Sequence, residues 1–275
     1  MRERIYGKRT NGEPMPPHWR PAPLGKRATK TDKPKSERVE QHLSSVYQVE
    51  NGESPRFLRK LFVSLAHPFT TLAALRHIIG IPVVHIDVAN SEKSKTAWIF
   101  DPHRSWRMSG FVSSYIELPS SLYLYWQGTA KQNLRTRTTQ AKVAGHSVRS
   151  VDPSEISAVV SQVTTDSGWG IREKERNLHE ISEALDNAIC VAVFDSSERA
   201  VAFCFGAQAG NAVRNLRAFT SQKGTVRWLC FSGYVEEASA RGARFVIESP
   251  PWAFTGGNRI FAGHLGFVPT LVRSN

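Results

Sequence analysis

A short polar segment with one glycine, residues 219–228 (FTSQKGTVRW), lies between an apolar stretch and a stretch with helical spacing. Gly224 has no side chain, so a ligand can approach the backbone closely there. A helix beginning near Thr225 leaves unpaired N–H groups and a partial positive charge at its start, and Gln222 and Lys223 add a donor and a charge. The segment predicts a phosphate-binding loop, with an ordinary helix start as the alternative.

Three further residues are candidates for chemistry near this loop. Glu248 ends the apolar segment ARFVIES and is a candidate general base, or else a structural carboxylate at a strand end. His264 is a candidate proton relay, because histidine is the side chain most often used for this purpose, with simple packing on a short helix as the alternative. Asn258 is a candidate for binding a donor molecule or for capping its helix.

The segment 129–151 is strongly basic, because it contains five Lys or Arg residues and no Asp or Glu. Arg135 and Arg137 are its candidates for contacting an anionic donor or substrate, and a solvated basic face is the alternative. The chain has three cysteines, which lie inside apolar stretches without metal-ligand spacing. We expect them to be reduced, buried thiols, and we expect no metal site.

From residue 145 onward, apolar patterns and turn residues alternate in a regular order. The pattern predicts strands at 146–151, 189–195, 200–208, 212–220, 243–249 and 267–272, and helices from 152, at 172–188, 225–241 and 256–266. A further helix is predicted at 133–144. An antiparallel meander of three strands that passes into a strand–helix–strand crossover indicates an α+β fold with a mixed sheet flanked by helices.

The upstream half of the chain shows less regular signals. Residues 41–129 predict a helical entry followed by strands at 81–89 and 95–101, and one or two short strands at 110–126 around Pro119. Residues 1–40 carry half of the net charge of +12 and are rich in proline, so they predict a disordered basic arm. Such an arm is able to touch nucleic acid, or it serves only as a solubilising tail.

The whole composition is that of a globular protein. The chain has 275 residues, of which 40% are hydrophobic, and no stretch approaches the roughly 18 apolar residues of a membrane span. The basic N-terminal segment has no apolar core typical of a secretion signal. We therefore expect a cytoplasmic protein without a membrane span.

The order of elements over residues 130–275 resembles the GNAT acyltransferase fold. The strand RNLRAFT, the segment SQKGTV and the following helix resemble the place where these enzymes bind the pyrophosphate of coenzyme A. The segment FVIES directly after the helix and the segment NRIFAGHLGFVP extend the likeness. The stretch YLYWQGTAKQNLRTRTTQAKVAGHSV resembles the basic helix that opens the second GNAT unit of Fem-type peptidyl transferases, and residues 41–129 are then candidates for a degenerate first unit.

The resemblance implies an N-acyltransferase that moves an acyl group, acetyl above all, from acyl-CoA to a small-molecule or peptide amine. It implies Glu248 and His264 as catalytic residues. The implied donor-binding residues are Phe219, Thr220, Ser221, Gln222, Lys223, Gly224, Thr225, Val226, Asn258 and Phe261.

Two alternatives to this function stay open. One is an aminoacyl-tRNA-dependent Fem-like transferase, in which the basic arm and residues 131–149 contact the tRNA. The other is a degenerate scaffold that binds nucleic acid or a protein without catalysis. Two departures from the family pattern bear on it: Val226 stands where a second small residue is usual, and Ala262 stands where a tyrosine often protonates the leaving thiolate.

Overall fold

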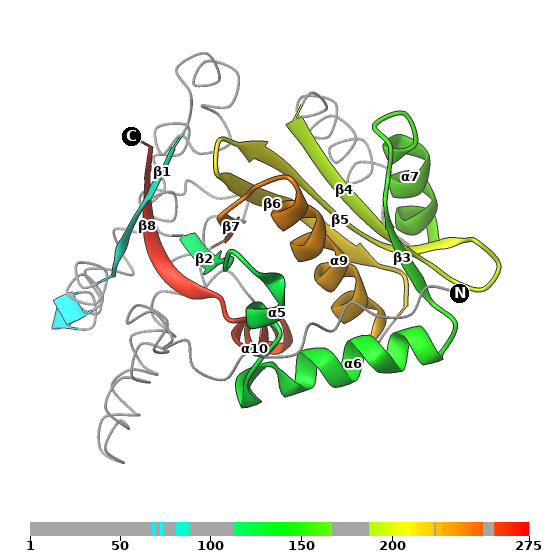
Figure 1. Cartoon of the computed structure of the whole chain (residues 1–275), viewed down its shortest axis with the longest axis horizontal. Coiled ribbons are helices and arrows are strands. Elements are labelled where there is room, and N and C mark those ends of the chain that lie inside the picture. Colours follow the sequence, from blue (N-terminus) through cyan, green and yellow to red (C-terminus); the bar gives the residue numbers. More distant parts are fainter. Residues whose placement is uncertain are drawn as a thin grey trace.

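The computed structural model describes seven stretches of the chain: residues 68–69, 72–73, 81–87, 113–166, 187–222, 224–249 and 256–274. Within them, eight strands form one mixed sheet in the order β1-β8-β2-β7-β6-β5-β4-β3, with helices packed against it (Figure 1). The α+β class with a mixed sheet, predicted from the sequence, is confirmed.

The strands are β1 (Val83–Ile86), β2 (Ser113–Glu117), β3 (Ser147–Ser150), β4 (Ala188–Phe194), β5 (Ala200–Ala209), β6 (Ala212–Thr220), β7 (Phe245–Glu248) and β8 (Val268–Ser274). The helices are α5 (Leu122–Tyr125), α6 (Gln132–Val143), α7 (Ile156–Asp166), α9 (Val226–Ala240) and α10 (Gly256–Leu265), with a 3-10 turn at Thr129–Lys131.

The sheet combines antiparallel and parallel pairs. Strands β3, β4, β5 and β6 are antiparallel neighbours in chain order, and β7 pairs in parallel with β6 after the chain has crossed through α9. Strand β2 lies between β7 and β8, antiparallel to both, and β1 pairs in parallel with β8. Since β1 and β2 precede residue 130, one sheet joins the regions 41–129 and 130–275. The division of the chain into domains stays a prediction, and residues 1–40 lie outside the described part.

One sequence-based prediction needs correction. The stretch 122–126 was expected to be strand-like, but after β2 and Pro119 the chain forms the short helix α5. Proline lacks the N–H that a paired strand needs, so the strand ends there. The helix turns Tyr125 inward, where its hydroxyl donates to the carbonyl of Leu265 over 2.9 Å. The strand expected at 95–101 and the helix expected at 172–188 lie outside the described residues.

The two faces of the sheet carry separate apolar cores, as the alternation of side chains along a strand requires. On one face, α9 and α6 pack against residues such as Val191, Cys204 and Val246. On the other, α7 packs against Cys190, Phe203 and their neighbours. Strand β4 is buried along its whole length because both of its faces are covered.

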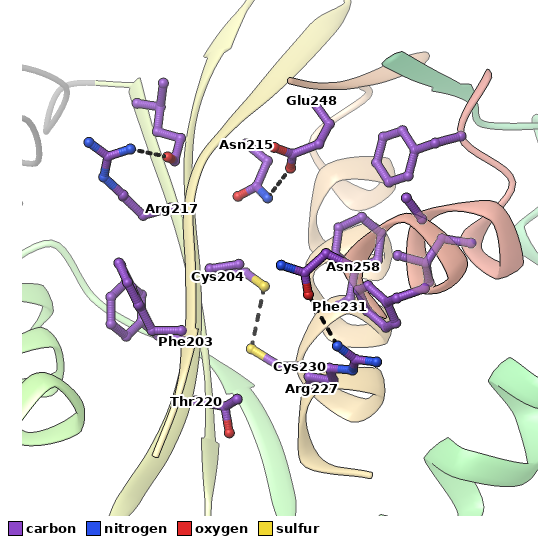
Figure 2. Close-up of a pocket in the computed structure, with 17 residues that line it drawn as sticks. Phe203, Cys204, Asn215, Arg217, Thr220, Arg227, Cys230, Phe231, Glu248 and Asn258 are labelled. Carbon is purple, nitrogen blue, oxygen red and sulfur yellow. Dashed lines mark hydrogen bonds between the residues drawn. The ribbon is translucent and has the colours of Figure 1, made fainter. Parts of the chain in front are cut away.

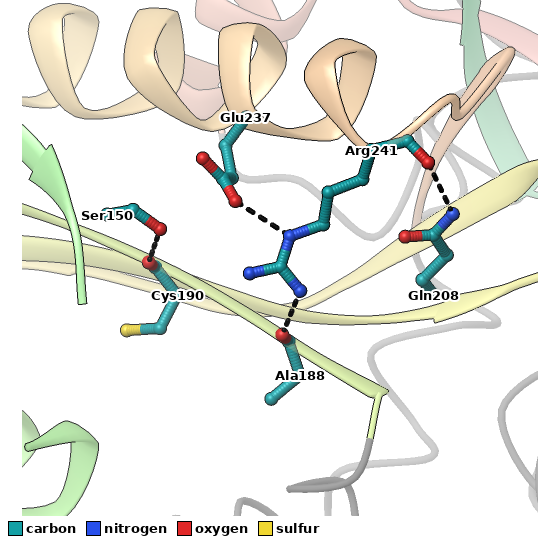
Figure 3. A network of polar contacts seen from close by, with 6 residues as sticks. All are labelled: Ser150, Ala188, Cys190, Gln208, Glu237 and Arg241. Carbon is teal, nitrogen blue, oxygen red and sulfur yellow. Dashed lines mark hydrogen bonds and ion pairs between the residues drawn. The ribbon is translucent and has the colours of Figure 1, made fainter. Parts of the chain in front are cut away.

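Helix α9 is the central helix of the first face, and its far end is fixed to the sheet by polar contacts. Arg241 donates to Glu237 over 2.7 Å and to the carbonyl of Ala188 on β4 over 2.8 Å, while Gln208 of β5 donates to the Arg241 carbonyl over 3.1 Å (Figure 3). Gly233 allows close packing, because a Cβ there would lie 2.5 Å from Val148 Cγ2. The position of α9 over the sheet is thereby fixed.

None of the helices in the described part of the chain is long and apolar enough to cross a membrane.

Candidate functional site

The site begins where the parallel strands β6 and β7 part. They pair only from Ala212 with Phe245 to Arg214 with Ile247, and β7 ends one residue later at Glu248. Strand β6 runs on to Thr220 and stays paired there with β5 alone among the described strands. Its edge on the β7 side therefore presents backbone polar groups beyond the point of separation.

A bulge in β6 coincides with this separation. Phe205 pairs with Arg217 but the next residue, Gly206, pairs with Asn215, so Leu216 is the extra residue. A bulge bends its strand and re-aims side chains locally. Figure 2 shows the result. Asn215, before the bulge, points to the side of the sheet that α9 covers, and Arg217, after the bulge, lies on the opposite side of the strands.

The predicted phosphate-binding loop connects β6 to α9. Gly224 has a φ of 99°, a conformation that glycine adopts without strain, and no described atom lies within 4 Å of the Cβ position. Thr220 Oγ1 accepts from the Gln222 N–H over 3.2 Å and donates to the Gln222 carbonyl over 2.6 Å. The Gln222 side chain contacts His146 Nε2 over 3.0 Å. The loop is therefore fixed by its own polar groups and by β6.

Within the described part of the chain, the first turn of α9 contains no acidic group. The N-cap residue of this helix, Thr225, makes no side-chain capping bond to a described residue. The first N–H groups of a helix have no partner inside it and bear partial positive charge, which Arg227 increases. Val226, which stands where a small residue was expected, is 2% exposed and packs into the core. This helix start is suited to an anion.

A cavity of about 260 Å³ lies between the free part of β6 and the helices α9 and α10. Its apolar lining opposite β6 includes Phe231, Phe261, Leu265 and Phe267, and the polar residues Arg227 and Asn258 line it from the same two helices. Figure 2 shows Asn215 and Glu248 at one end of the site and Arg227 with Thr220 toward the other. The cavity thus joins a carboxyl group to the loop region through an apolar passage.

At the first end, Glu248 is held by two donors. Asn215 Nδ2 donates to its Oε2, and the Ser249 N–H donates to its Oε1 over 3.1 Å. Burial raises the pKa of Glu248, although these hydrogen bonds and the charges of Arg214 and Arg217 act in the opposite direction. A carboxylate with a raised pKa is a stronger base, which suits acceptance of a proton from a substrate.

At the other end, Arg227 reaches from the first turn of α9 toward α10. Its guanidinium donates to Asn258 Oδ1 over 3.3 Å and lies 4.4 Å from the centre of the Phe261 ring. Partial burial lowers its pKa, yet an arginine keeps its charge at neutral pH. Arg227 is therefore a fixed cation beside the cavity.

Two of the three thiols also line the cavity. Cys204 Sγ of β5 and Cys230 Sγ of α9 lie 3.5 Å apart. Burial raises the pKa of Cys230 well above its ordinary value. It also raises the pKa of Cys190, the thiol outside the cavity, to about 12. Cys230 and Cys190 are therefore neutral thiols and poor nucleophiles. Among the described residues, no group of three or more His, Cys, Asp or Glu is placed to hold a metal ion.

The structure brings together some of the residues singled out from the sequence. Those that line the cavity are Phe219, Thr220, Glu248, Asn258 and Phe261. Those that form the adjoining loop and helix start are Ser221, Gln222, Gly224, Thr225 and Val226. Lys223 lies outside the described residues.

Three other candidates lie apart from the cavity. His264 is on α10 but does not line the cavity; it contacts Asn133 of α6 over 3.3 Å. Arg135 donates to the carbonyls of Trp126 and Gly128, so its guanidinium fixes the turn before α6. Arg137 is exposed and donates to Gln140 within α6.

Sequence reasoning missed two polar residues of the site. The sequence places Asn215 inside a strand. Because side chains alternate along a strand, Asn215 shares the buried face with Val213, and a polar residue on that face is a signal of a site. Arg227 was read as part of a helix, although it lies in the first turn, next to the predicted loop. The pairing of β6 with β7 makes Asn215 relevant, because it places Glu248 beside it, and the packing of α10 against α9 makes Arg227 relevant, because it brings Asn258 within reach.

No protein-family model matches the sequence, and no curated protein matches it. Among solved structures, L-PGS from Bacillus licheniformis is similar at 12% identity with a TM-score of 0.44, over 57% of each chain. The C-terminal domain of a putative lysylphosphatidylglycerol synthetase from Agrobacterium fabrum has 10% identity and a TM-score of 0.43, over 57% of this chain and 58% of the other. FemX has 10% identity and a TM-score of 0.41, over 57% and 59%. The match thus spans little more than half the length of each of these proteins.

Proposed function

We propose that the protein is an acyltransferase that moves an acyl group from a phosphate-bearing donor to an amine. The observation that supports this most is the cavity where β6 and β7 part, with the partly buried carboxyl group of Glu248 at one end and Arg227 with the start of α9 toward the other. This is the arrangement expected of a GNAT-type transferase, as the sequence resemblance implies.

The donor is bound by its phosphate and its acyl arm. The start of α9, Gly224 and Arg227 together offer backbone donors, close approach and a positive charge to a phosphate group. The acyl arm lies along the edge of β6 beyond its pairing with β7, where polar groups of the donor would pair with the strand backbone in place of β7. An N–H of this edge that meets the carbonyl oxygen would stabilise the negative charge that develops on it.

The transfer is completed by proton movement at Glu248. The amine nitrogen attacks the acyl carbonyl carbon, a carbon–nitrogen bond forms, and the bond to the leaving sulfur or oxygen breaks. Glu248 accepts the proton that the amine nitrogen loses, and the leaving group takes up one proton, so the overall reaction neither gains nor loses protons. Ala262 lines the cavity and supplies no acid for the leaving group.

The donor we propose first is acyl-CoA, whose pyrophosphate suits the start of α9. An aminoacyl-tRNA is the second candidate, because α6 carries exposed Arg137 and Lys142 and no acid, and packs against α9. A tRNA would make salt-dependent contacts with such a surface. Both donors present phosphate to the same helix start.

Thermal stability in the presence of each donor tests the proposal. Saturating acetyl-CoA should raise the melting temperature by several degrees, and a Gly224→Glu change should abolish that shift because it adds a negative charge at the loop. Gly242→Glu is the matched control: Gly242 has a φ of 80° and no described atom within 4 Å of the Cβ position, but lies at the opposite end of α9.

The possible outcomes separate the donors. A shift produced by aminoacyl-tRNA but not by acetyl-CoA, and lost at high salt, would replace acyl-CoA by the second candidate. If neither donor stabilises the protein and no acylated amine forms, the transferase function is wrong. If acetyl-CoA stabilises Gly224→Glu as well as the unchanged protein, the phosphate does not bind at this loop.

A further inference from the structure

Two buried polar atoms without a partner belong to residues next to Glu248, in the candidate site. Among the described residues, four buried side-chain oxygens have no hydrogen-bond partner: Ser114 Oγ, Thr138 Oγ1, Asn215 Oδ1 and Tyr234 Oη. Ser114 is directly opposite Glu248 in the β2–β7 pair, and Asn215 donates to Glu248. A buried polar group without a partner is costly, so such an atom in a native fold indicates a missing partner.

Asn215 is the member of this group that faces the cavity. The residue is 7% exposed, it lines the cavity, and its Nδ2 is engaged by Glu248 Oε2. Its Oδ1 is left as an acceptor without a donor. Because the carboxylate of Glu248 also only accepts hydrogen bonds when ionised, this end of the cavity offers acceptors and negative charge.

The chemistry of these acceptors selects the ligand group. A carboxylate or phosphate would meet the Glu248 carboxylate and the Asn215 Oδ1 without donating to either. A hydroxyl donates one hydrogen bond and carries no charge, whereas a primary ammonium donates three and carries a positive charge. The wall that faces this end is apolar, with the ring centre of Phe231 lying 5.6 Å from that of Phe267 and 6.1 Å from that of Phe261.

We propose that the cavity end formed by Asn215 Oδ1 and the Glu248 carboxylate is a subsite for a primary ammonium group carried on an apolar body. The inference rests on the proposed function, for which it names the acceptor as an apolar primary amine. Asn215 orients the nitrogen, and Glu248 takes one of the three ammonium protons to free the lone pair for attack. A second proton passes from the nitrogen to the leaving group after the carbon–nitrogen bond has formed, and Glu248 then releases its own proton to solvent. The third proton stays on the amide nitrogen, and this N–H keeps its bond to Asn215.

Direct binding of a probe amine tests the subsite without any donor. Calorimetry would compare phenethylamine with 2-phenylethanol, which replaces the ammonium by a hydroxyl, and with trimethylphenethylammonium, which keeps the charge but has no N–H. We expect phenethylamine to bind at least about tenfold more tightly than either analogue, since both N–H donation and charge contribute.

Substitutions at Asn215 then locate the contact. Asn215→Leu should weaken phenethylamine binding by about tenfold and leave the weak binding of 2-phenylethanol unchanged, whereas Asn215→Asp keeps an acceptor and should retain phenethylamine. Thr138→Val is the control, because Thr138 has the same kind of unpartnered buried oxygen but lies on α6. Equal affinity for amine and alcohol, or an undiminished affinity in Asn215→Leu, overturns the inference.

The outcomes also keep the inference apart from the transferase proposal. Amine binding that depends on Asn215, without stabilisation by any donor and without an acylated product, would support the subsite and refute the transferase. If the donor stabilises Asn215→Leu as much as the unchanged protein, and acyl transfer proceeds at the same rate in both, the transferase proposal is supported and the subsite is refuted.

Discussion

At the scale of single residues, the site depends on a carboxyl group that the fold partly encloses. Glu248 follows three buried residues of β7 and is held by Asn215 and by the Ser249 backbone. The raised pKa that follows from burial means that the folded protein holds the proton of this carboxyl group more tightly than an unfolded chain does. The same property that suits a general base therefore costs stability at neutral pH.

This cost predicts a pH-dependent effect of Glu248→Gln. The contribution of Glu248 to stability is full below its ordinary pKa of 4.5 and is lost as the pH rises through the higher pKa of the folded state. The substituted protein should therefore gain unfolding free energy relative to the unchanged protein as the pH rises from 4 to 8. Urea denaturation of both proteins across this pH range measures the difference in unfolding free energy. Glu155→Gln, at an exposed position, is the control. A difference that stays constant with pH would contradict the prediction.

At the scale of elements, the wall of the cavity depends on how α10 ends. Lys131 Nζ and the Tyr125 hydroxyl both donate to the carbonyl of Leu265 in the last turn of α10, and Lys131 lies 4.1 Å from the centre of the Tyr125 ring. Cations at a helix C-terminus interact favourably with its dipole. Lys131 and Tyr125 thereby fix the helix that carries Asn258 and Phe261 into the cavity.

The ammonium of Lys131 gives this junction its own pH dependence. Burial lowers its pKa from 10.5 to about 8, so between these values the unfolded chain binds more protons than the folded one. Stability from this group therefore rises with pH from about 8 to 10.5. The Lys131→Met protein should lack this rise in unfolding free energy. The Lys142→Met protein, which is changed on the exposed part of α6, should keep it. Guanidinium titrations at pH 7.5, 9 and 10.5 provide the measurement, and parallel curves for Lys131→Met and the unchanged protein would refute the prediction.

At the scale of the whole molecule, burial is concentrated in β4 and β5, the two strands next to the edge strand β3. Strand β4 is buried at every residue and β5 at all but one, whereas β3 is mostly exposed. Local stability follows buried contacts, so β3 should open before β4 and β5.

Hydrogen exchange tests this gradient along the sheet. We expect amides of β4 and β5 to exchange only by global unfolding, and the outward N–H groups of β3 to exchange orders of magnitude faster. The part of β6 beyond Asn215 should gain protection when a donor binds, because its free edge then finds partners. Uniform protection across all strands would argue against the gradient.

Much of this molecule follows from local sequence, and the rest follows from pairing over long distances. The helical spacing of Trp228, Phe231 and Val235 is enough to predict α9, and the glycine at 224 is enough to place a turn before it. The contact of Asn215 with Glu248 is not predictable in this way, because it depends on the parallel register of β6 and β7 across an intervening helix. For the same reason α5 was missed: apolar residues at 122–126 suit a strand or a helix equally, and the contact of Tyr125 with Leu265 decides between them.

The position of β8 has a consequence for synthesis. It lies between β1 and β2, and its Thr270 donates to the carbonyl of Pro82, 188 residues earlier. During translation, β1 has no neighbour within the described sheet until residues 268–274 have left the ribosome, since β8 alone pairs with it. The meander from β3 to β6 is complete well before that moment. We therefore expect nascent chains that stop before residue 268 to protect β4 and β5 from proteolysis while leaving β1 open to cleavage.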